Sequence, residues 1–68
     1  MHTLFSISLN GGKIEFSLVG VADVHKKTAK FQAVCNGGVF FEGIDYEKVR
    51  SKLMDAVQLN QSNVEALN

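Results

Sequence analysis

Apolar and polar residues alternate on both sides of an Asn-Gly-Gly tripeptide near the N-terminus. The apolar positions are odd before the tripeptide and even after it: Phe5, Ile7, Leu9, Ile14, Phe16 and Leu18. A period of two is typical of strands that bury one face. Asn-Gly or Gly-Gly between two such runs indicates a β-hairpin, because its tight turn needs residues that tolerate positive φ.

The change of parity restricts the length of the hairpin loop. Residues that lie opposite each other in an antiparallel pair share a face, so an odd apolar residue must lie opposite an even one. An even loop, either Asn10-Gly11 or Gly11-Gly12, satisfies this condition. A three-residue loop would place Ile7 opposite Glu15 and divide the apolar face.

The same tripeptide recurs at 36–38 and predicts a second hairpin. An even loop there places one set of residues on the core face: Phe31, Ala33, Cys35, Phe40 and Ile44. Gly20 marks a bulge or bend in the strand before it. Residues 25–28 form an exposed turn, and this short connection favours a meander.

The periodicity becomes helical after residue 44. Asp45 is a suitable N-cap, and Glu47 in the first turn suits the positive end of the helix dipole. One apolar stripe follows at helical spacing: Tyr46, Val49, Leu53, Ala56 and Val57. Asn60 is a reasonable end for the helix.

The elements together predict a single α+β domain over residues 1–68 with the order ββββα. We expect a four-stranded antiparallel meander built from two Asn-Gly-Gly hairpins, with one C-terminal helix packed on one face. The strands cover about 2–9, 13–24, 28–36 and 39–44, and the helix covers about 46–60. Residues 61–68 form a short helical turn or a frayed tail.

The composition fits a small globular protein, with 46 % apolar and 21 % charged residues in a chain of 68. Seven basic and seven acidic residues give zero net charge, which disfavours a strongly basic nucleic-acid binder. A domain of this size buries only about 60 % of its unfolded surface. With one cysteine it forms no intrachain disulfide, so we expect self-association to supply stability.

The sequence offers little material for catalysis. Cys35 alternates with Phe31 and Ala33, which predicts a small residue on the core face and no reactive thiol. His2 and His25 lack the spacing of a metal site. We therefore expect no enzyme activity, cofactor or metal. No signal peptide or membrane-spanning run is apparent, so we expect a cytoplasmic location.

The sheet face opposite the helix carries the main functional prediction. One helix covers one face, so the other should expose an apolar patch: Val19, Val21, Val34, Val39 and Phe41. Such patches mark interaction surfaces. We expect a protein-binding module, such as an inhibitor, adaptor or accessory subunit of bacterial or phage type. It would act through the sheet face or an edge, as a homodimer or on a larger protein partner, without contact to a membrane.

A cluster of lysines supports an alternative function. Lys26, Lys27 and Lys30 lie near the central turn, and Phe40 and Phe41 lie on a strand where aromatic rings can stack on bases. The alternative is a small nucleic-acid-binding or regulatory protein that uses this corner.

Overall fold

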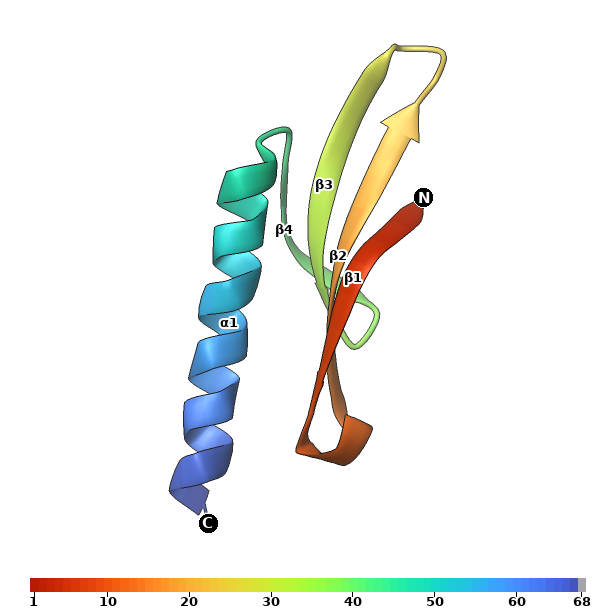
Figure 1. Ribbon diagram of the computed structural model, residues 1–68. Helices are drawn as coiled ribbons and strands as arrows, with labels where there is room; N and C mark the ends of the chain where they lie inside the picture. Colours follow the sequence, from red (N-terminus) through yellow and green to blue (C-terminus); the bar gives the residue numbers. More distant parts are fainter. Residues whose placement is uncertain (68) are drawn as a thin grey trace.

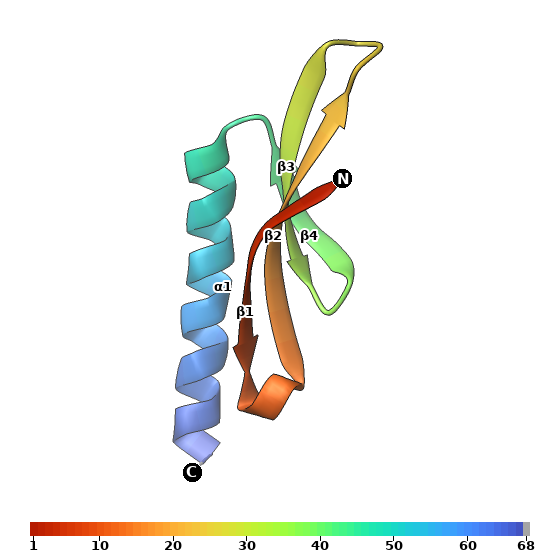
Figure 2. The ribbon, with the colours of Figure 1, turned by 45° about the vertical axis from the view of Figure 1, so that its right-hand side comes forward.

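The computed structural model describes the backbone of residues 1–67 and the side chains of residues 1–61. Four antiparallel strands form one sheet in the order β1-β2-β3-β4, and a C-terminal helix lies along one face of it (Figures 1 and 2). The bounds are β1 (His2–Leu9), η1 (Asn10–Gly12), β2 (Ile14–Asp23), β3 (Thr28–Cys35), β4 (Gly38–Gly43) and α1 (Tyr46–Leu67). The predicted ββββα fold is confirmed.

The first hairpin turns through η1. Asn10, Gly11 and Gly12 all have positive φ, at 53°, 65° and 89°, which asparagine and glycine tolerate better than other residues. Leu9 lies opposite Ile14, so the loop spans residues 10–13. The predicted two-residue loop, Asn10-Gly11 or Gly11-Gly12, is therefore wrong, because the loop has four residues. Four is also an even number, so the predicted sharing of faces by the two strands is kept.

The second hairpin has a two-residue loop. Cys35 lies opposite Gly38, and Asn36 and Gly37 have φ of 49° and 85°. Two successive positive φ values are typical of a type I′ turn, whose twist matches that of the flanking strands. The even loop predicted here is confirmed.

The hydrophobic core lies between β2, β3 and α1. Its six side chains are at most 5 % exposed: Phe16, Leu18, Ala33, Val49, Leu53 and Val57. The predicted N-cap is present, since Asp45 Oδ1 accepts hydrogen bonds from the Glu47 and Lys48 N–H groups at 3.0 and 3.4 Å. The helical stripe that starts after this cap supplies three of the six core residues.

A β-bulge interrupts β4 at Phe40. Val39 lies opposite Val34, and Phe41 lies opposite Ala33, so Phe40 is an extra residue. Val39 therefore faces away from α1, whereas Phe41 shares the helix side with the buried Ala33. The prediction that Phe41 faces away from the helix is wrong. Parity assumes that each residue of β4 has one partner in β3, and Phe40 has none.

Phe40 and Ile44, which parity predicts on the core face, are also exposed. Phe40 is 44 % exposed, and its ring contacts that of Phe16 edge-on at 6.2 Å between centroids. Ile44, which follows the last residue of β4, is 83 % exposed. The prediction that Ile44 lies on the core face is wrong, because the extra residue in β4 reverses the parity beyond it.

A second bulge lies at the other edge of the sheet, in β1. Thr3 lies opposite Val19 and Phe5 opposite Leu18, so Leu4 is the extra residue. The sequence predicts a bulge or bend at Gly20 of β2. Gly20 is paired regularly with β3, and the extra residue lies on the neighbouring strand β1. Both edge strands of the sheet are bulged, a feature that disturbs pairing along the bulged stretch.

The helix is longer than predicted, since α1 continues through Leu67. Asn60 does not end it but lies within it, where its Nδ2 donates to the Ala56 carbonyl at 2.8 Å. The separate turn or frayed tail predicted from residue 61 is thus part of α1 as far as residue 67, and residue 68 lies outside the described residues.

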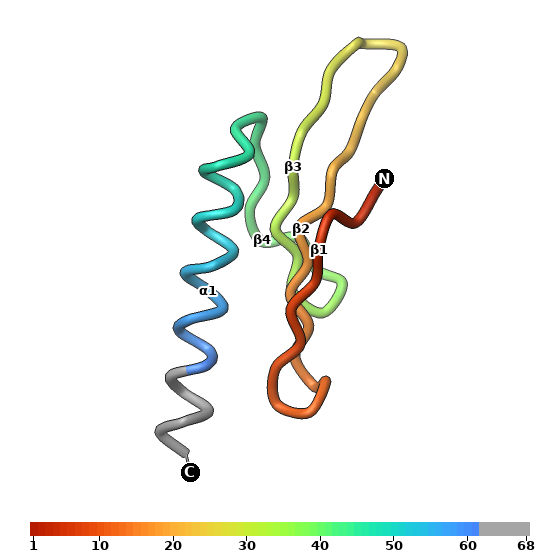
Figure 3. The backbone as a smooth tube through the Cα atoms, in the orientation of Figure 1, coloured from red at the N-terminus to blue at the C-terminus, as the bar shows by residue number. Residues whose placement is uncertain are grey.

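The hairpin of β2 and β3 extends beyond both edge strands (Figure 3). The last pairs at this end of the sheet are His2 with Gly20 and Phe31 with Gly43. Residues 21–30 therefore form a two-stranded arm, and the molecule measures 49 × 20 × 15 Å.

Candidate interaction surfaces

The face of the sheet opposite α1, here called the open face, carries four of the five residues predicted as an apolar patch. Val19 lies between Thr3 and Gln32 of the neighbouring strands and is only 6 % exposed. Val21 and Val34 are half-buried, and Val39 is 49 % exposed. The apolar patch on this face is therefore narrower than expected.

Phe41 packs on the helix side instead. It lies against the core cluster, and the Lys52 ammonium is 5.7 Å from the centroid of its ring. This distance is within the range of a cation–π interaction. Phe41 thus joins β4 to α1.

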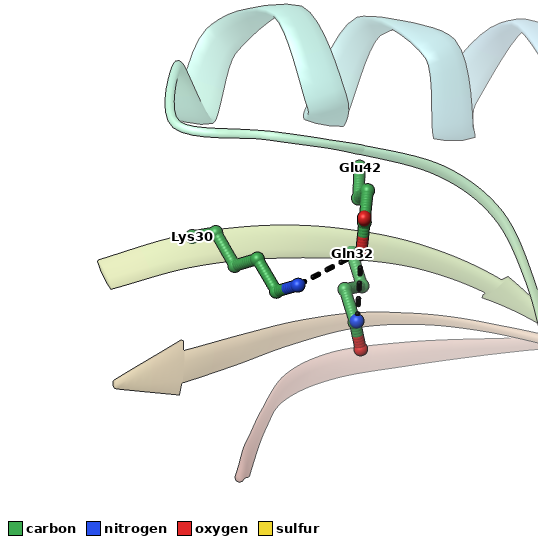
Figure 4. Close-up of polar contacts among 3 residues, drawn as sticks. All are labelled: Lys30, Gln32 and Glu42. Carbon is green, nitrogen blue, oxygen red and sulfur yellow. Dashed lines mark hydrogen bonds and ion pairs between the residues drawn. The ribbon is translucent and has the colours of Figure 1, made fainter. Parts of the chain in front are cut away.

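A polar cluster crosses the open face beside the valines (Figure 4). Glu42 Oε2 accepts a hydrogen bond from Gln32 Nε2 at 3.0 Å and lies 3.3 Å from Lys30 Nζ. The Gln32 hydrogen bond, followed by the hydrogen bond and charge of Lys30, lowers the pKa of Glu42 below its ordinary value. Lys30 and Glu42 therefore form an ion pair on the exposed surface of the sheet.

Three apolar side chains are exposed along β4, one of them being Val39 of the open face. Val39, Phe40 and Ile44 are 49 %, 44 % and 83 % exposed, and we call these three residues the β4 surface. A shallow hollow lined by Val39 and Phe40 and another lined by Ile44 both reach Phe41. The sequence signal for this surface is the pair of adjacent phenylalanines, because two neighbouring large apolar residues do not fit strict alternation.

The structure brings two of the three predicted lysines together and leaves the third apart. Lys26 and Lys27 lie in the turn of the β2–β3 arm, where Asp23 Oδ1 accepts hydrogen bonds from the His25 and Lys26 N–H groups. Lys30 lies on β3 and pairs with Glu42. A groove of about 360 Å³ brings the side chains of Lys26 and Lys30 together with Asp23, Val21, Thr28, Ala29 and Ile44, without Lys27.

Cys35 is half-buried beside the core cluster, on the predicted face. Within the described residues, no three His, Cys, Asp or Glu side chains are grouped closely enough to hold a metal ion. The described part of α1 and of the rest of the chain contains no helix long and apolar enough to cross a membrane.

Comparison with known proteins gives no relative. No protein-family model matches the chain, and searches of curated proteins and of solved structures found no similar protein. The surfaces described above are therefore the observations on which a function can be proposed.

Proposed function

We propose that the protein is a small, non-catalytic protein-binding module that works as a homodimer, with its sheet as the interaction surface. The observation that carries this proposal is the area of the single chain. Its accessible surface is 4901 Å², whereas a compact monomer of 7.4 kDa is expected to expose about 4200 Å². The single chain thus exposes about 700 Å² more than a compact monomer of this mass, and association with a second chain would bury part of its surface.

The elongated shape agrees with this surplus. The radius of gyration is 13.2 Å, against about 11 Å for a compact chain of this length. Small domains gain much of their stability from the fraction of surface that they bury. Burial against a second chain would raise that fraction for this protein.

Exposed apolar side chains supply contact groups for a partner protein, apart from the contact between the two copies. They lie on the β4 surface, at Val39, Phe40 and Ile44, and to a smaller extent on the open face, at Val21 and Val34. Surfaces of this kind favour association with another protein, so an inhibitor, adaptor or accessory subunit is the class of function that we propose.

Sedimentation velocity across the micromolar range tests the proposal. We expect the mass to rise from that of one chain to that of two as the concentration increases. A single-chain mass at high micromolar concentration would contradict the homodimer. Multi-angle light scattering on the same samples supplies an independent mass.

The β2–β3 arm favours one alternative, a nucleic-acid-binding protein. The arm projects from the sheet with Lys26 and Lys27 at its turn, and its groove also receives Lys30. Titration of generic DNA and RNA at increasing salt tests this function, because affinity carried by phosphate contacts falls steeply with salt. Binding that is absent at low salt would exclude it.

A further inference from the structure

The outer edge of β1 differs from that of β4 in the features that prevent strand addition. β4 has six residues, a bulge at its centre and a charged residue, Glu42. β1 has eight residues, and its bulge at Leu4 leaves Phe5–Leu9 in regular register with β2. The stretch from Thr3 to Leu9 contains no Asp, Glu, Lys or Arg. Edge strands that are long, regular and uncharged are the ones to which another strand is added.

The hydrogen bonds of β2 indicate which backbone groups of β1 are free. The Glu15 carbonyl accepts a hydrogen bond from the Asn36 N–H, and the Glu15 N–H donates to Asn36 Oδ1, both at 2.8 Å. The main-chain groups of Glu15 therefore point toward β3. Because these groups alternate along an antiparallel pair, Ser8, which lies opposite Glu15, points its own N–H and carbonyl away from the sheet. Ser6, two residues earlier, does the same.

The regular stretch Phe5–Leu9 is also symmetric in its pattern of apolar and polar residues. Phe-Ser-Ile-Ser-Leu reads apolar, polar, apolar, polar, apolar from either end, with Ile7 at the centre. The bulge at Leu4 and the turn at Asn10 bound it at equal distances from Ile7. A second copy in antiparallel orientation would therefore present a serine to each serine and an apolar residue to each apolar residue.

We propose that two copies of this chain pair through Phe5–Leu9 of β1, around a twofold axis at Ile7, to form one eight-stranded antiparallel sheet. Ser6 exchanges main-chain hydrogen bonds with the partner's Ser8, and Ile7 lies beside the partner's Ile7. Both α1 helices lie on the same face of the joined sheet. This geometry rests on the proposed homodimer and specifies its interface.

Packing at the margin of the core supports this assignment. Phe5, Ile7 and Leu9 lie against the core cluster but stay half-buried, because α1 packs mainly on β2, β3 and β4. In the joined sheet Phe5 lies beside the partner's Leu9 on the helix side. Apolar surface at the edge of each core is thereby buried, which uses part of the surplus area of the single chain.

Two double variants that differ at one position test the geometry. In Ser6→Lys/Ser8→Lys, positions 6 and 8 place like charges opposite each other across the proposed interface. In Ser6→Glu/Ser8→Lys the charges at the same positions are opposite. Both serines are exposed on the open face, and the lysine at position 8 would lie beside Glu15 within the same chain, so neither variant disturbs the core.

We expect the dissociation constant of the dimer to rise by roughly tenfold or more in Ser6→Lys/Ser8→Lys, because like charges face each other. Ser6→Glu/Ser8→Lys should dimerise at least as well as the wild type. Sedimentation velocity gives the masses, and circular dichroism verifies that both variants fold. A dimer of unchanged affinity in Ser6→Lys/Ser8→Lys would overturn the β1 interface and leave the homodimer standing. A wild type that stays monomeric at high micromolar concentration would overturn both.

Discussion

Asn36 and Glu15 are joined by two hydrogen bonds, one between backbone groups and one in which the Asn36 side chain takes the place of a backbone carbonyl. The Asn36 N–H donates to the Glu15 carbonyl, while the Glu15 N–H donates to Asn36 Oδ1, each at 2.8 Å. Asn36 has already left β3 and has φ of 49°, yet it prolongs the pairing with β2. It thereby ties the second hairpin turn to the first strand pair and fixes the direction of the Glu15 main chain.

Substitutions of Asn36 should separate its two contributions. Asn36→Gly keeps a residue that tolerates positive φ. It removes both side-chain hydrogen bonds, the one that Oδ1 accepts from the Glu15 N–H and the one that Nδ2 donates to the Lys13 carbonyl at 3.4 Å. We therefore expect a loss of about 0.5–1.5 kcal/mol in the free energy of unfolding. Asn36→Ala also forces an alanine into the left-handed region and should cost about 1 kcal/mol more. Urea unfolding of both variants supplies the values. An alanine variant as stable as the glycine variant would contradict this account of the turn.

Glu42 should titrate below the ordinary range of a glutamate. The hydrogen bond from Gln32 and the ion pair with Lys30 favour its charged form and lower its pKa. Its stabilising contribution is then complete above the unfolded pKa and is lost as the pH falls through the folded pKa. Titration by NMR should show the pKa of Glu42 moving upward in Gln32→Ala and in Lys30→Met. An unchanged pKa in both variants would show that the cluster does not persist in solution.

Aspartate substitutions distinguish the two faces of β4. Phe41→Asp places a charge beside the core under α1 and should cost about 2–4 kcal/mol of stability. Val39→Asp changes a half-exposed residue on the open face and should cost less than about 1 kcal/mol. Thermal unfolding measures both, and equal losses would contradict the bulge at Phe40. Val39→Asp should also leave the dimer mass unchanged, since the proposed interface lies at the opposite edge of the sheet.

The sequence allowed the four strands, both hairpins and the helix to be predicted, because alternation, Asn-Gly turns and the Asp45 cap are local signals. Ile7 and Ile14 pack against the core cluster, and Ser6, Ser8 and Glu15 are exposed, as the parity of the first hairpin predicts.

The bulges were the part that alternation could not predict. Parity counts one residue for each partner, and one extra residue reverses the faces of all residues beyond it. For this reason parity predicts the wrong face for Phe41, the largest residue of the predicted apolar patch. The predicted helix end at Asn60 is wrong for a different reason, since a single asparagine is only modestly unfavourable in a helix and α1 continues through Leu67.

The proposed interface at the edge of β1 depends on features that the sequence alone does not show. The uncharged stretch around Ile7 is visible in the chain, but its position at a free edge follows only from the strand order. The outward direction of the Ser6 and Ser8 backbone follows from the Glu15–Asn36 pair. Both are tertiary relationships.

Disulfide cross-linking of Ile7→Cys in a Cys35→Ala background tests the β1 interface most directly. Residues that face each other in a non-hydrogen-bonded antiparallel pair have Cα atoms about 4.5 Å apart, within the range of a disulfide. Under mild oxidation we expect this variant to form a covalent dimer rapidly at concentrations where the wild type is dimeric. Val24→Cys in the same background is the control, because Val24 is 83 % exposed at the tip of the arm. Cross-linking of Ile7→Cys that is no faster than that of Val24→Cys would contradict the pairing of β1 with a second copy.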